Sequence, residues 1–384
     1  MRKFIDLKIG IIGGGQLGKM IVQEAKKMGL HVTILDPTPN SPASQMADEQ
    51  IIADLNNEEK IKELVNKCDI TTFEIEHINT EVLKSLEENG DNIFPTSRVL
   101  EIIKDKSKQK EFLNKFNIPT SNWKMINEDE PVDENFGFPV VQKACRGGYD
   151  GRGVYVIKNK EDIENRLKTE SFLEEYIDFD KELAVMVARN RQGEIKCYPL
   201  VEMTFDEEEN ICDMIIAPAR VDESICKKAS EIAVECVKSL DGIGVFGIEM
   251  FLTKDNRILV NEIAPRVHNS GHYSIEGCVT SQFEQHIRCI MGLPLGSTEL
   301  LVPTVVMNVL GEKGHYGTPD YVGINESLEI PGVNIHIYGK KEVRPYRKMG
   351  HVTIVDKDVE KAMEKAYRVK KTLKAISKEV DYEE

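Results

Sequence analysis

The sequence lacks close cysteine pairs and any apolar run long enough to cross a membrane. Its eight cysteines are scattered and form no CxxC pair, so we expect reduced thiols of a cytosolic protein, without disulfides or a zinc site. The longest apolar run, residues 300–310, contains Pro303 and Asn308 and is well short of the ~20 residues that a membrane helix needs. Residues 1–7 are charged and show no pattern of a secretory signal. We therefore expect a cytoplasmic protein with no membrane partner.

The sequence is also poor in positive charge. Its 50 Lys and Arg residues are outnumbered by 65 Asp and Glu residues, which gives a formal net charge of −15. Such a balance argues against a surface that binds nucleic acid, although it leaves room for a local basic pocket. The 384 residues are enough for two or three domains, each with its own core.

The first part of the chain predicts a parallel α/β domain. Strand Lys8–Ile12 runs into the loop GGGQLG at residues 13–18, a helix follows as far as Met28, and a second strand covers His31–Leu35. A strand, glycine loop, helix and strand in this order favour a parallel sheet. A later strand, Asp69–Phe73, would extend that sheet.

The glycine loop leaves three interpretations open. Gly13, Gly15 and Gly18 match GxGxxG, and Asp36 stands about where a dinucleotide-binding fold places its ribose-binding acid. A substrate phosphate at the helix N-terminus fits these glycines equally well. A tight turn without a ligand is the third interpretation.

Two carboxylates follow the third strand of this domain. Glu74 and Glu76 come directly after Phe73. Ligands of open parallel sheets bind beyond the carboxyl ends of the strands, so these side chains are well placed to touch one. Either could equally be a solvated loop charge.

A second glycine loop lies in the middle of the chain. Strand Phe138–Lys143 ends in a lysine, and RGGYDGRG follows at residues 146–153. Backbone N–H groups of such a loop can close over a triphosphate while Lys143 supplies positive charge. No GK[ST] follows, so this is not a Walker A loop, and the lysine precedes the glycines, unlike in a kinase. The basic helix predicted at residues 104–116 is typical of a solvated face.

The stretch NEIAPRVHNSGH, residues 261–272, combines a carboxylate, an arginine and two histidines. It is preceded by two strands that a turn at Asp255 and Asn256 would join, which places Glu249 opposite Glu262. Like charges that face each other across a sheet are unfavourable. A divalent cation between them would remove the conflict, whereas two solvated carboxylates on an open sheet face are the simpler interpretation.

Taken together, these motifs resemble the ATP-grasp superfamily. Within it, the chain is similar to the 5-(carboxyamino)imidazole ribonucleotide synthase family, whose motifs occur here in the same order between Gly13 and His351. The segments that carry the resemblance are GGGQLG, RGGYDGRG, NEIAPRVHNSGH, SQFEQH and RPYRKMGH.

The resemblance implies an α/β and α+β multidomain fold. Its parts would be a Rossmann-like pre-ATP-grasp domain (1–104), an ATP-grasp domain (105–298), a small carboxy-terminal domain (299–376) and a tail (377–384). The implied reaction joins bicarbonate to the exocyclic amine of aminoimidazole ribonucleotide and splits ATP, through carboxyphosphate, in purine biosynthesis. Mg²⁺ and a homodimer are implied as well.

The resemblance also implies roles for individual residues. Those expected to bind ATP are Lys106, Lys143, Gly148, Tyr149, Asp150, Gly151, Arg152, Gly153, Val154, Glu174, Glu175, Tyr176, Ile177, Glu182, Asn261 and Glu262. Within this set, Glu174 to Ile177 would present backbone groups to adenine, and Glu182 would accept hydrogen bonds from the ribose. Glu249 and Glu262 would hold Mg²⁺ against the phosphates.

A second set is expected to face the other substrates. The residues expected near the imidazole ribonucleotide and the carboxyl group are Gln16, Glu74, Tyr149, Asp150, Arg152, Asn269, Ser270, His272, Arg347 and Lys348. Arg266, His268 and Lys348 are expected to be catalytic, the first two at bicarbonate or carboxyphosphate. No general base is named, because phosphate released from carboxyphosphate could take the amine proton.

One position departs from the family pattern. Many members carry a histidine near ATP where this chain has Phe205, which cannot donate a hydrogen bond. The rival functions are a nicotinamide-dependent dehydrogenase, based on the first glycine loop, a non-catalytic nucleotide-binding protein, and an ATP-grasp enzyme that acts on another ribonucleotide. The dehydrogenase would leave the second glycine loop and the Glu249/Glu262 pair without a role.

Overall fold

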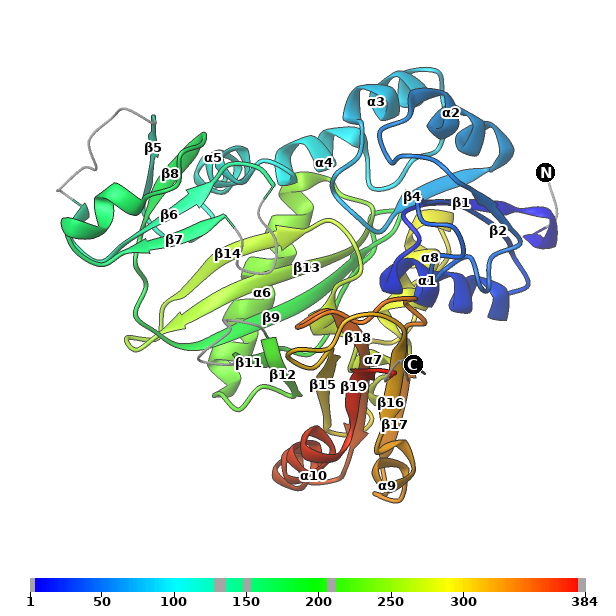
Figure 1. The fold of residues 1–384 in the computed structure, drawn as a ribbon. Helices are drawn as coiled ribbons and strands as arrows, with labels where there is room; N and C mark the ends of the chain where they lie inside the picture. Colours follow the sequence, from blue (N-terminus) through cyan, green and yellow to red (C-terminus); the bar gives the residue numbers. More distant parts are fainter. Residues whose placement is uncertain (1–3, 128–135, 148–152, 206–211, 379–384) are drawn as a thin grey trace, which may run out of the picture.

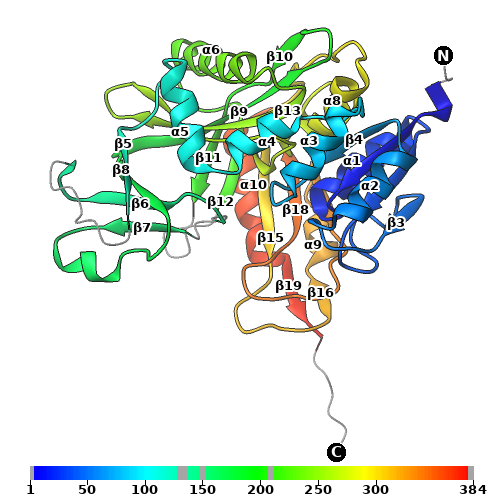
Figure 2. The same cartoon turned by 90° about the horizontal axis from the view of Figure 1, so that it is seen from above.

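The computed structural model describes residues 4–127, 136–147, 153–205 and 212–378 (Figure 1). It is built on three main sheets. The amino-terminal domain and a small four-stranded lobe lie at opposite ends of a large central sheet, and the carboxy-terminal strands extend that sheet on a third side (Figures 1 and 2).

The amino-terminal domain contains the predicted parallel sheet. Its elements are β1 (Lys8–Ile12), α1 (Gln16–Lys27), β2 (His31–Leu35), β3 (Glu49–Ile51), α2 (Glu58–Lys67), β4 (Ile70–Phe73), α3 (Thr80–Glu88) and α4 (Ser97–Ile103), after a short 3-10 turn, η1 (Phe4–Asp6). The strands are all parallel, in the order β3-β2-β1-β4. Asn57 and Asn79 cap α2 and α3 by accepting backbone N–H bonds, as polar N-cap residues do. The carboxyl ends of β1 and β4 therefore lie side by side.

The small lobe carries the second glycine loop. It consists of β5 (Trp123–Ile126), β6 (Val140–Ala144), β7 (Val154–Ile157), the 3-10 turn η3 (Glu161–Asn165) and β8 (Ser171–Glu175). Its antiparallel strand order is β5-β8-β6-β7. Helix α5 (Lys106–Lys115) leads into this lobe. Thr120, between α5 and β5, bridges to Val260 and so ties the lobe to the edge of the central sheet.

The central sheet has nine strands and includes the hairpin of the predicted site. The middle part of the chain supplies β9 (Phe179–Arg189), β10 (Ile195–Cys197), β11 (Val201–Phe205), β12 (Cys212–Ala217), β13 (Gly244–Thr253) and β14 (Ile258–Ala264). The strand-like stretch at residues 195–203 is interrupted, and β10 and β11 are separate strands beside β9. Pro199 lies in the break, where it has no N–H to offer a ladder.

The carboxy-terminal segment continues the same sheet. Its elements are β15 (Thr304–Leu310), β16 (Pro319–Val322), α9 (Ile324–Leu328), β17 (Val333–Ile337), β18 (Lys348–Val355), α10 (Val359–Thr372) and β19 (Lys374–Ser377). Strands β15, β18 and β17 follow β12 in the sheet order β14-β13-β9-β11-β12-β15-β18-β17. Strand β16 pairs with β19, which lies more than 50 residues later in the chain. The domain boundaries at residues 104, 298 and 376 stay predictions.

Helices cover the sheets so that one face of the central hairpin stays open. Helix α6 (Glu223–Leu240) packs with α5 on the face formed by alternate residues of β9, β13 and β14. Helix α8 (Gln282–Met291) packs between the central sheet and α1, and α10 covers the carboxy-terminal strands. Glu249 and Glu262 alternate with the residues beneath α6, so they project from the opposite face. Among the described residues, no helix is long and apolar enough to span a bilayer.

Candidate active site

The site is built on the hairpin of β13 and β14. Glu249 pairs directly with Glu262, as the sequence predicted. A bulge follows, because Met250 pairs with Val260 and leaves Asn261 as the extra residue. Asn256 adopts a left-handed conformation, with φ 61°, in the predicted turn. The bulge brings Asn261 and Glu262 to the site together.

The two carboxylates differ in their surroundings. Lys106, at the start of α5, places its Nζ 2.7 Å from Glu262 Oε2. Although burial opposes ionisation, Lys106 and Lys143 hold the pKa of Glu262 below its usual value. Burial, together with the charges of Glu262 and Glu182, raises the pKa of Glu249 to about 7. The positive charges of Lys106 and Lys348 act on Glu249 as well, but they do not offset its burial and the like charges.

Helix α5 also fixes the strand that carries Glu262. Gln109 is buried, and its Oε1 accepts the backbone N–H of Ile263 at 2.9 Å while its Nε2 donates to the Ile263 carbonyl at 3.3 Å. Strand β14 is the edge of the central sheet, where backbone groups would otherwise lack partners. Gln109 was missed in the sequence, although its position one turn after Asp105, in a helix predicted near the site, is a usable signal.

The lysine before the second glycine loop points toward the hairpin. Lys143 Nζ lies 2.6 Å from Glu174 Oε2 and 2.9 Å from Asn261 Oδ1. Lys110 contacts the other oxygen of Glu174. The interpretation of the basic helix as a solvated face is therefore wrong for Lys110, which is buried, whereas the expected role of Lys106 at ATP stays a prediction. These residues are one helical turn apart and share the inner face of α5.

The strand predicted to meet adenine has mixed exposure. The Glu174 side chain is buried, Glu175 accepts a hydrogen bond from Asn122 at 2.8 Å, Tyr176 is exposed and Ile177 is buried. Glu182 lies on β9, across from Phe251 of β13, on the face that carries Glu249. Burial raises the pKa of Glu182 to about 7, and Lys143 opposes the shift. Several site carboxylates thus share one poorly solvated space.

Arg266 and His268 follow the hairpin directly. Arg266 Nε lies 2.8 Å from Glu76 Oε1, so the amino-terminal domain holds this arginine. His268 Nε2 lies 3.6 Å from Glu249 Oε1. The backbone N–H of Ser270 donates to His268 Nδ1 at 3.4 Å, which leaves the ring proton on Nε2. Burial and the charges of Arg266 and Lys348 lower the pKa of His268 to about 3.

The residues after His268 form a support beneath the site. Asn269 and Ser270 lie in a 3-10 turn, η4 (Asn269–Gly271), and Ser270 is buried against His268. His272 is also buried, with its Nδ1 3.2 Å from Gln282 Nε2, and its ring lies 4.5 Å from that of His351. Burial lowers the pKa of His272. The short helix α7 (Ser274–Gly277) follows.

The first glycine loop is closed by its own domain. Asp36 accepts the N–H of Gly14 at 2.8 Å, and Glu74 accepts the N–H groups of Gly15 and Gly18. Burial raises the pKa of Glu74 to about 7. A dinucleotide pyrophosphate needs these amides, so the geometry disfavours the dehydrogenase alternative. Gln16 opens α1 beside this loop.

The carboxy-terminal domain brings Lys348 toward the site. Lys348 opens β18, and its charge acts on His268, His272 and Glu249. Arg347 Nη1 donates to the Glu342 carbonyl at 2.8 Å. Phe205 ends β11 half-buried against the core, and it offers no polar contact in place of the histidine.

The second glycine loop is only partly described. The carbonyl of Gly153 accepts the N–H of Ala144 at 2.8 Å, and Val154 pairs with Lys143. At the other end of the loop, Arg146 Nε lies 2.9 Å from Asp105 Oδ2. Five residues with predicted roles lie outside the described residues: Gly148, Tyr149, Asp150, Gly151 and Arg152.

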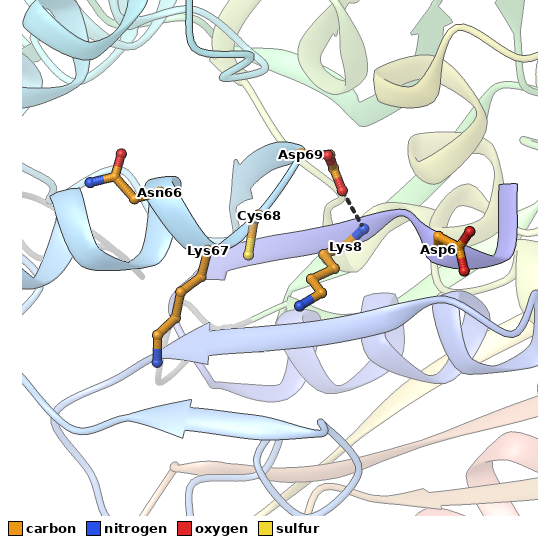
Figure 3. Close-up of a pocket in the computed structure, with 6 residues that line it drawn as sticks. All are labelled: Asp6, Lys8, Asn66, Lys67, Cys68 and Asp69. Atoms are coloured by element: carbon orange, nitrogen blue, oxygen red, sulfur yellow. Dashed lines mark hydrogen bonds between the residues drawn. The ribbon is translucent and has the colours of Figure 1, made fainter. Parts of the chain in front are cut away.

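A surface pocket lies away from this chemistry. It encloses about 620 Å³ and is lined by residues at the start of β1 and β4, among them Asp6, Lys8, Cys68 and Asp69 (Figure 3). Asp69 accepts the backbone N–H of Lys8 at 2.9 Å. This is the amino end of the parallel strands, whereas ligands of such sheets bind at the carboxyl end. Burial raises the pKa of Cys68 to about 11, so this thiol is not activated.

Comparison with protein families divides the chain into three matches. Residues 7–104 match the ribonucleotide synthetase preATP-grasp domain, residues 111–283 the ATP-grasp domain, and residues 304–365 the phosphoribosylaminoimidazole carboxylase C-terminal domain. These matches confirm the predicted three-part fold class.

Individual relatives match nearly the whole chain. The N5-carboxyaminoimidazole ribonucleotide synthase of Bacillus subtilis is 40% identical over 90% of this chain and 91% of its own. The phosphoribosylaminoimidazole carboxylase of Ogataea methanolica is 40% identical over 97% of this chain. Such carboxylases are longer proteins: the chain spans 71% of the Ogataea methanolica protein and 65% of that of Candida albicans.

Solved structures agree with these relatives. The N5-carboxyaminoimidazole ribonucleotide synthetase of Thermotoga maritima is 58% identical, with a TM-score of 0.90 over 97% of this chain and all of its own. A synthase from Aspergillus clavatus, solved with ADP and 5-aminoimidazole ribonucleotide, is 34% identical, with a TM-score of 0.88 over 96% of this chain and 99% of its own. Because identity is this high and coverage nearly complete, the chain belongs to the N5-carboxyaminoimidazole ribonucleotide synthase family.

Proposed function

We propose that this chain carboxylates the exocyclic amine of 5-aminoimidazole ribonucleotide with bicarbonate, at the expense of ATP, in purine biosynthesis. The products are 5-(carboxyamino)imidazole ribonucleotide, ADP and phosphate. The observation that carries the proposal is the opposition of Glu249 and Glu262 on one hairpin, directly before Arg266 and His268. The carboxylate pair suits phosphate chemistry, and the arginine and histidine beside it suit the binding of a small anion.

The carboxylate pair fits a divalent cation. Lys106 compensates Glu262, whereas the pKa of Glu249 is raised to about 7 by burial and by like charge. No group of three His, Cys, Asp or Glu side chains in the described parts of the chain could hold a metal ion by itself. Mg²⁺ commonly binds through one or two carboxylates together with substrate phosphates. Glu249 and Glu262 would hold it, and it would neutralise phosphate charge.

The reaction needs two displacements. A bicarbonate oxygen attacks the γ-phosphorus of ATP, and the bond to the β-phosphate oxygen breaks, which gives carboxyphosphate and ADP. The amine nitrogen then attacks the carboxyl carbon, the carbon–oxygen bond to phosphate breaks, and the amine proton leaves with phosphate. Lys106 and Lys143 supply positive charge on the nucleotide side, as phosphoryl transfer requires.

Arg266 and His268 suit the carboxyl side of the reaction. Arg266 keeps its charge beside Glu76, which raises the pKa of the guanidinium against the effect of burial, and it can neutralise a carboxyphosphate oxygen. Since Ser270 donates to His268 Nδ1, the proton on Nε2 makes this neutral ring a hydrogen-bond donor. His268 therefore orients the anion and does not serve as the base at Nε2.

An isotope experiment tests the proposal. Purified protein is incubated with ATP, Mg²⁺, aminoimidazole ribonucleotide and ¹⁸O-labelled bicarbonate, and the released phosphate is analysed by mass spectrometry. The expected result is one labelled oxygen in each phosphate, with ADP release dependent on all the components. Hydrolysis of ATP without label in the phosphate would rule out carboxyphosphate.

We also propose that the protein acts as a cytoplasmic homodimer without nucleic-acid partners. The family resemblance supports the dimer, and the net charge of −15 supports the absence of nucleic acid. Light scattering coupled to gel filtration, which gives the mass directly, should return twice the 43.5 kDa of one chain.

A further inference from the structure

Lys110 is a buried lysine whose donors are all used within the protein. Its side chain is 3% exposed. Nζ lies 2.6 Å from Thr120 Oγ1 and 2.8 Å from Ser121 Oγ, and it also contacts Glu174 Oε1. A lysine ammonium has three protons to donate. Lys110 therefore has none left for a nucleotide, and a direct binding role is excluded.

Glu174 is held from both sides. Its Oε1 contacts Lys110 Nζ and accepts a hydrogen bond from the Ser121 hydroxyl. Its Oε2 lies 2.6 Å from Lys143 Nζ. Burial alone would raise the pKa of this carboxyl, but the two lysines lower it to about 2. Glu174 is thus a fixed, fully ionised carboxylate between two cations.

Lys143 is the member of this network that reaches the site. Two of its protons go to Glu174 and Asn261, and Asn261 neighbours Glu262. Within the described parts of the chain, Glu174 and Asn261 are the acceptors that Lys143 Nζ contacts. Lys143 therefore has a donor available for a phosphate, provided that its other two bonds keep it in place.

We propose that Lys110 is a positioning residue for ATP, which acts on the nucleotide through Glu174 and Lys143. By occupying Oε1, Lys110 limits Glu174 to a single contact with Lys143. Without Lys110, Oε1 of Glu174 keeps only the neutral Ser121 hydroxyl, and Lys143 becomes the only cation in contact with the carboxylate. Lys143 then turns toward the carboxylate and away from Asn261. The inference rests on the proposed use of ATP but not on the identity of the carboxyl acceptor.

The test replaces Lys110 with methionine, which matches the length of the side chain and removes its charge. Binding of Mg-ATP and of Mg-ADP is measured by calorimetry, and kcat and KM for ATP are measured by ADP release. We expect nucleotide affinity to fall by about 10- to 100-fold, and Lys110→Arg to restore part of it. Lys108→Met is the matched control, because Lys108 lies on the same helix but pairs with Glu101 at the surface.

A double-mutant cycle separates positioning from a general loss of structure. In a Lys143→Met background, Lys110→Met should cause no further loss of nucleotide affinity, because both changes disable the same contact. The proposal is overturned if the losses of nucleotide affinity in the two single variants add in the double variant. It is also overturned if Lys110→Met keeps the wild-type affinity and only melts at a lower temperature. If Lys110→Met does not fold, Ser121→Ala removes one bond to Oε1, and unchanged ATP affinity in that variant counts equally against it.

The pH dependence gives a second readout. The groups that act on Glu174 are Lys110 and Lys106 from α5, Lys143 from β6 and Ser121 before β5. Loss of Lys110 raises the pKa of Glu174, so the acid limb of ATP binding should move to higher pH, whereas Lys110→Arg leaves it in place. An unmoved acid limb in Lys110→Met contradicts the proposal. Because binding is measured without bicarbonate or ribonucleotide, failure of the carboxylation assay would not affect this test.

Discussion

Arg266 and Glu76 form an ion pair between two domains, with Nε 2.8 Å from Oε1. Glu76 follows β4 of the amino-terminal domain, and Arg266 follows the hairpin of the central sheet. Both side chains are about one-fifth exposed, at 19% and 21%. A charged pair with little solvent access has a fixed geometry, so the amino-terminal domain sets the direction of an arginine that we place at the carboxyl group.

Glu76→Gln should therefore reduce kcat by about 10- to 100-fold while KM for ATP stays unchanged. The amide keeps the size of the side chain but loses the charge that orients Arg266. Steady-state ADP release measures both constants. Glu81→Gln, an exposed change on α3, is the control, and equal activity of the two variants would remove Glu76 from the positioning role.

Glu262→Gln should lower kcat by about 100- to 1000-fold and leave the affinity for aminoimidazole ribonucleotide unchanged. Its carboxylate is proposed to hold Mg²⁺, and the ribonucleotide is expected at other residues. Calorimetry with the ribonucleotide alone and turnover at saturating Mg²⁺ separate the two effects. An active Glu262→Gln enzyme would exclude this carboxylate as a ligand; Glu299→Gln, at an exposed site, controls for loss of charge.

Glu249 should make the metal-free protein less stable as pH rises. Its folded-state pKa of about 7 lies above the ordinary 4.5, so its contribution to stability is fully present below pH 4.5 and is lost as pH rises through 7. Compared with the wild type, Glu249→Gln should be equally stable near pH 4.5 and more stable by about 2 to 3 kcal/mol at pH 8.

Denaturant unfolding in EDTA at several pH values measures this difference. The buried histidines titrate in both proteins, so the difference between the wild type and Glu249→Gln reports the contribution of Glu249 alone. Mg²⁺ together with ADP should reverse the order at pH 8, because only the wild type has both carboxylates. If the difference in stability between the two proteins does not change with pH, ionisation of Glu249 does not destabilise the folded protein.

Gln109→Leu should lower the free energy of unfolding by about 2 to 4 kcal/mol. The leucine leaves the N–H and the carbonyl of Ile263 without their partners at the edge of β14. Thermal or urea unfolding gives the change, and Lys108→Leu on the outer face of α5 is the control for helix propensity. If the two variants unfold alike, the edge contact contributes little.

The sequence predicted the parts of the fold that depend on local pattern. The parallel sheet, the β13–β14 turn and the opposition of Glu249 and Glu262 were all correct, because hydrophobic period and turn residues determine them. The break at Pro199 and the pairing of β16 with β19 were missed. Pairing between remote segments leaves no local signal.

The site was predicted less completely than the fold. The family resemblance brought Lys106, Lys143 and Arg266 into consideration, but it could not show which carboxylate each one meets. The basic helix was interpreted as solvated because the sequence does not show which of its charged side chains point toward solvent. The packing shows that Lys110 and Gln109 point inward. Individual roles at the substrates stay predictions.

The continuity of the central sheet has a consequence for motion. Backbone hydrogen bonds join β12 to β15 and β15 to β18, so Lys348 is carried by the same ladder of strands as Glu249. A hinge between these two groups would require breaking several such bonds together. The lobe of β5 to β8 is a separate sheet, connected at the β14 edge through Thr120. If the protein opens and closes over a nucleotide, we therefore expect this lobe to move while the carboxylate pair and Lys348 keep their positions relative to each other.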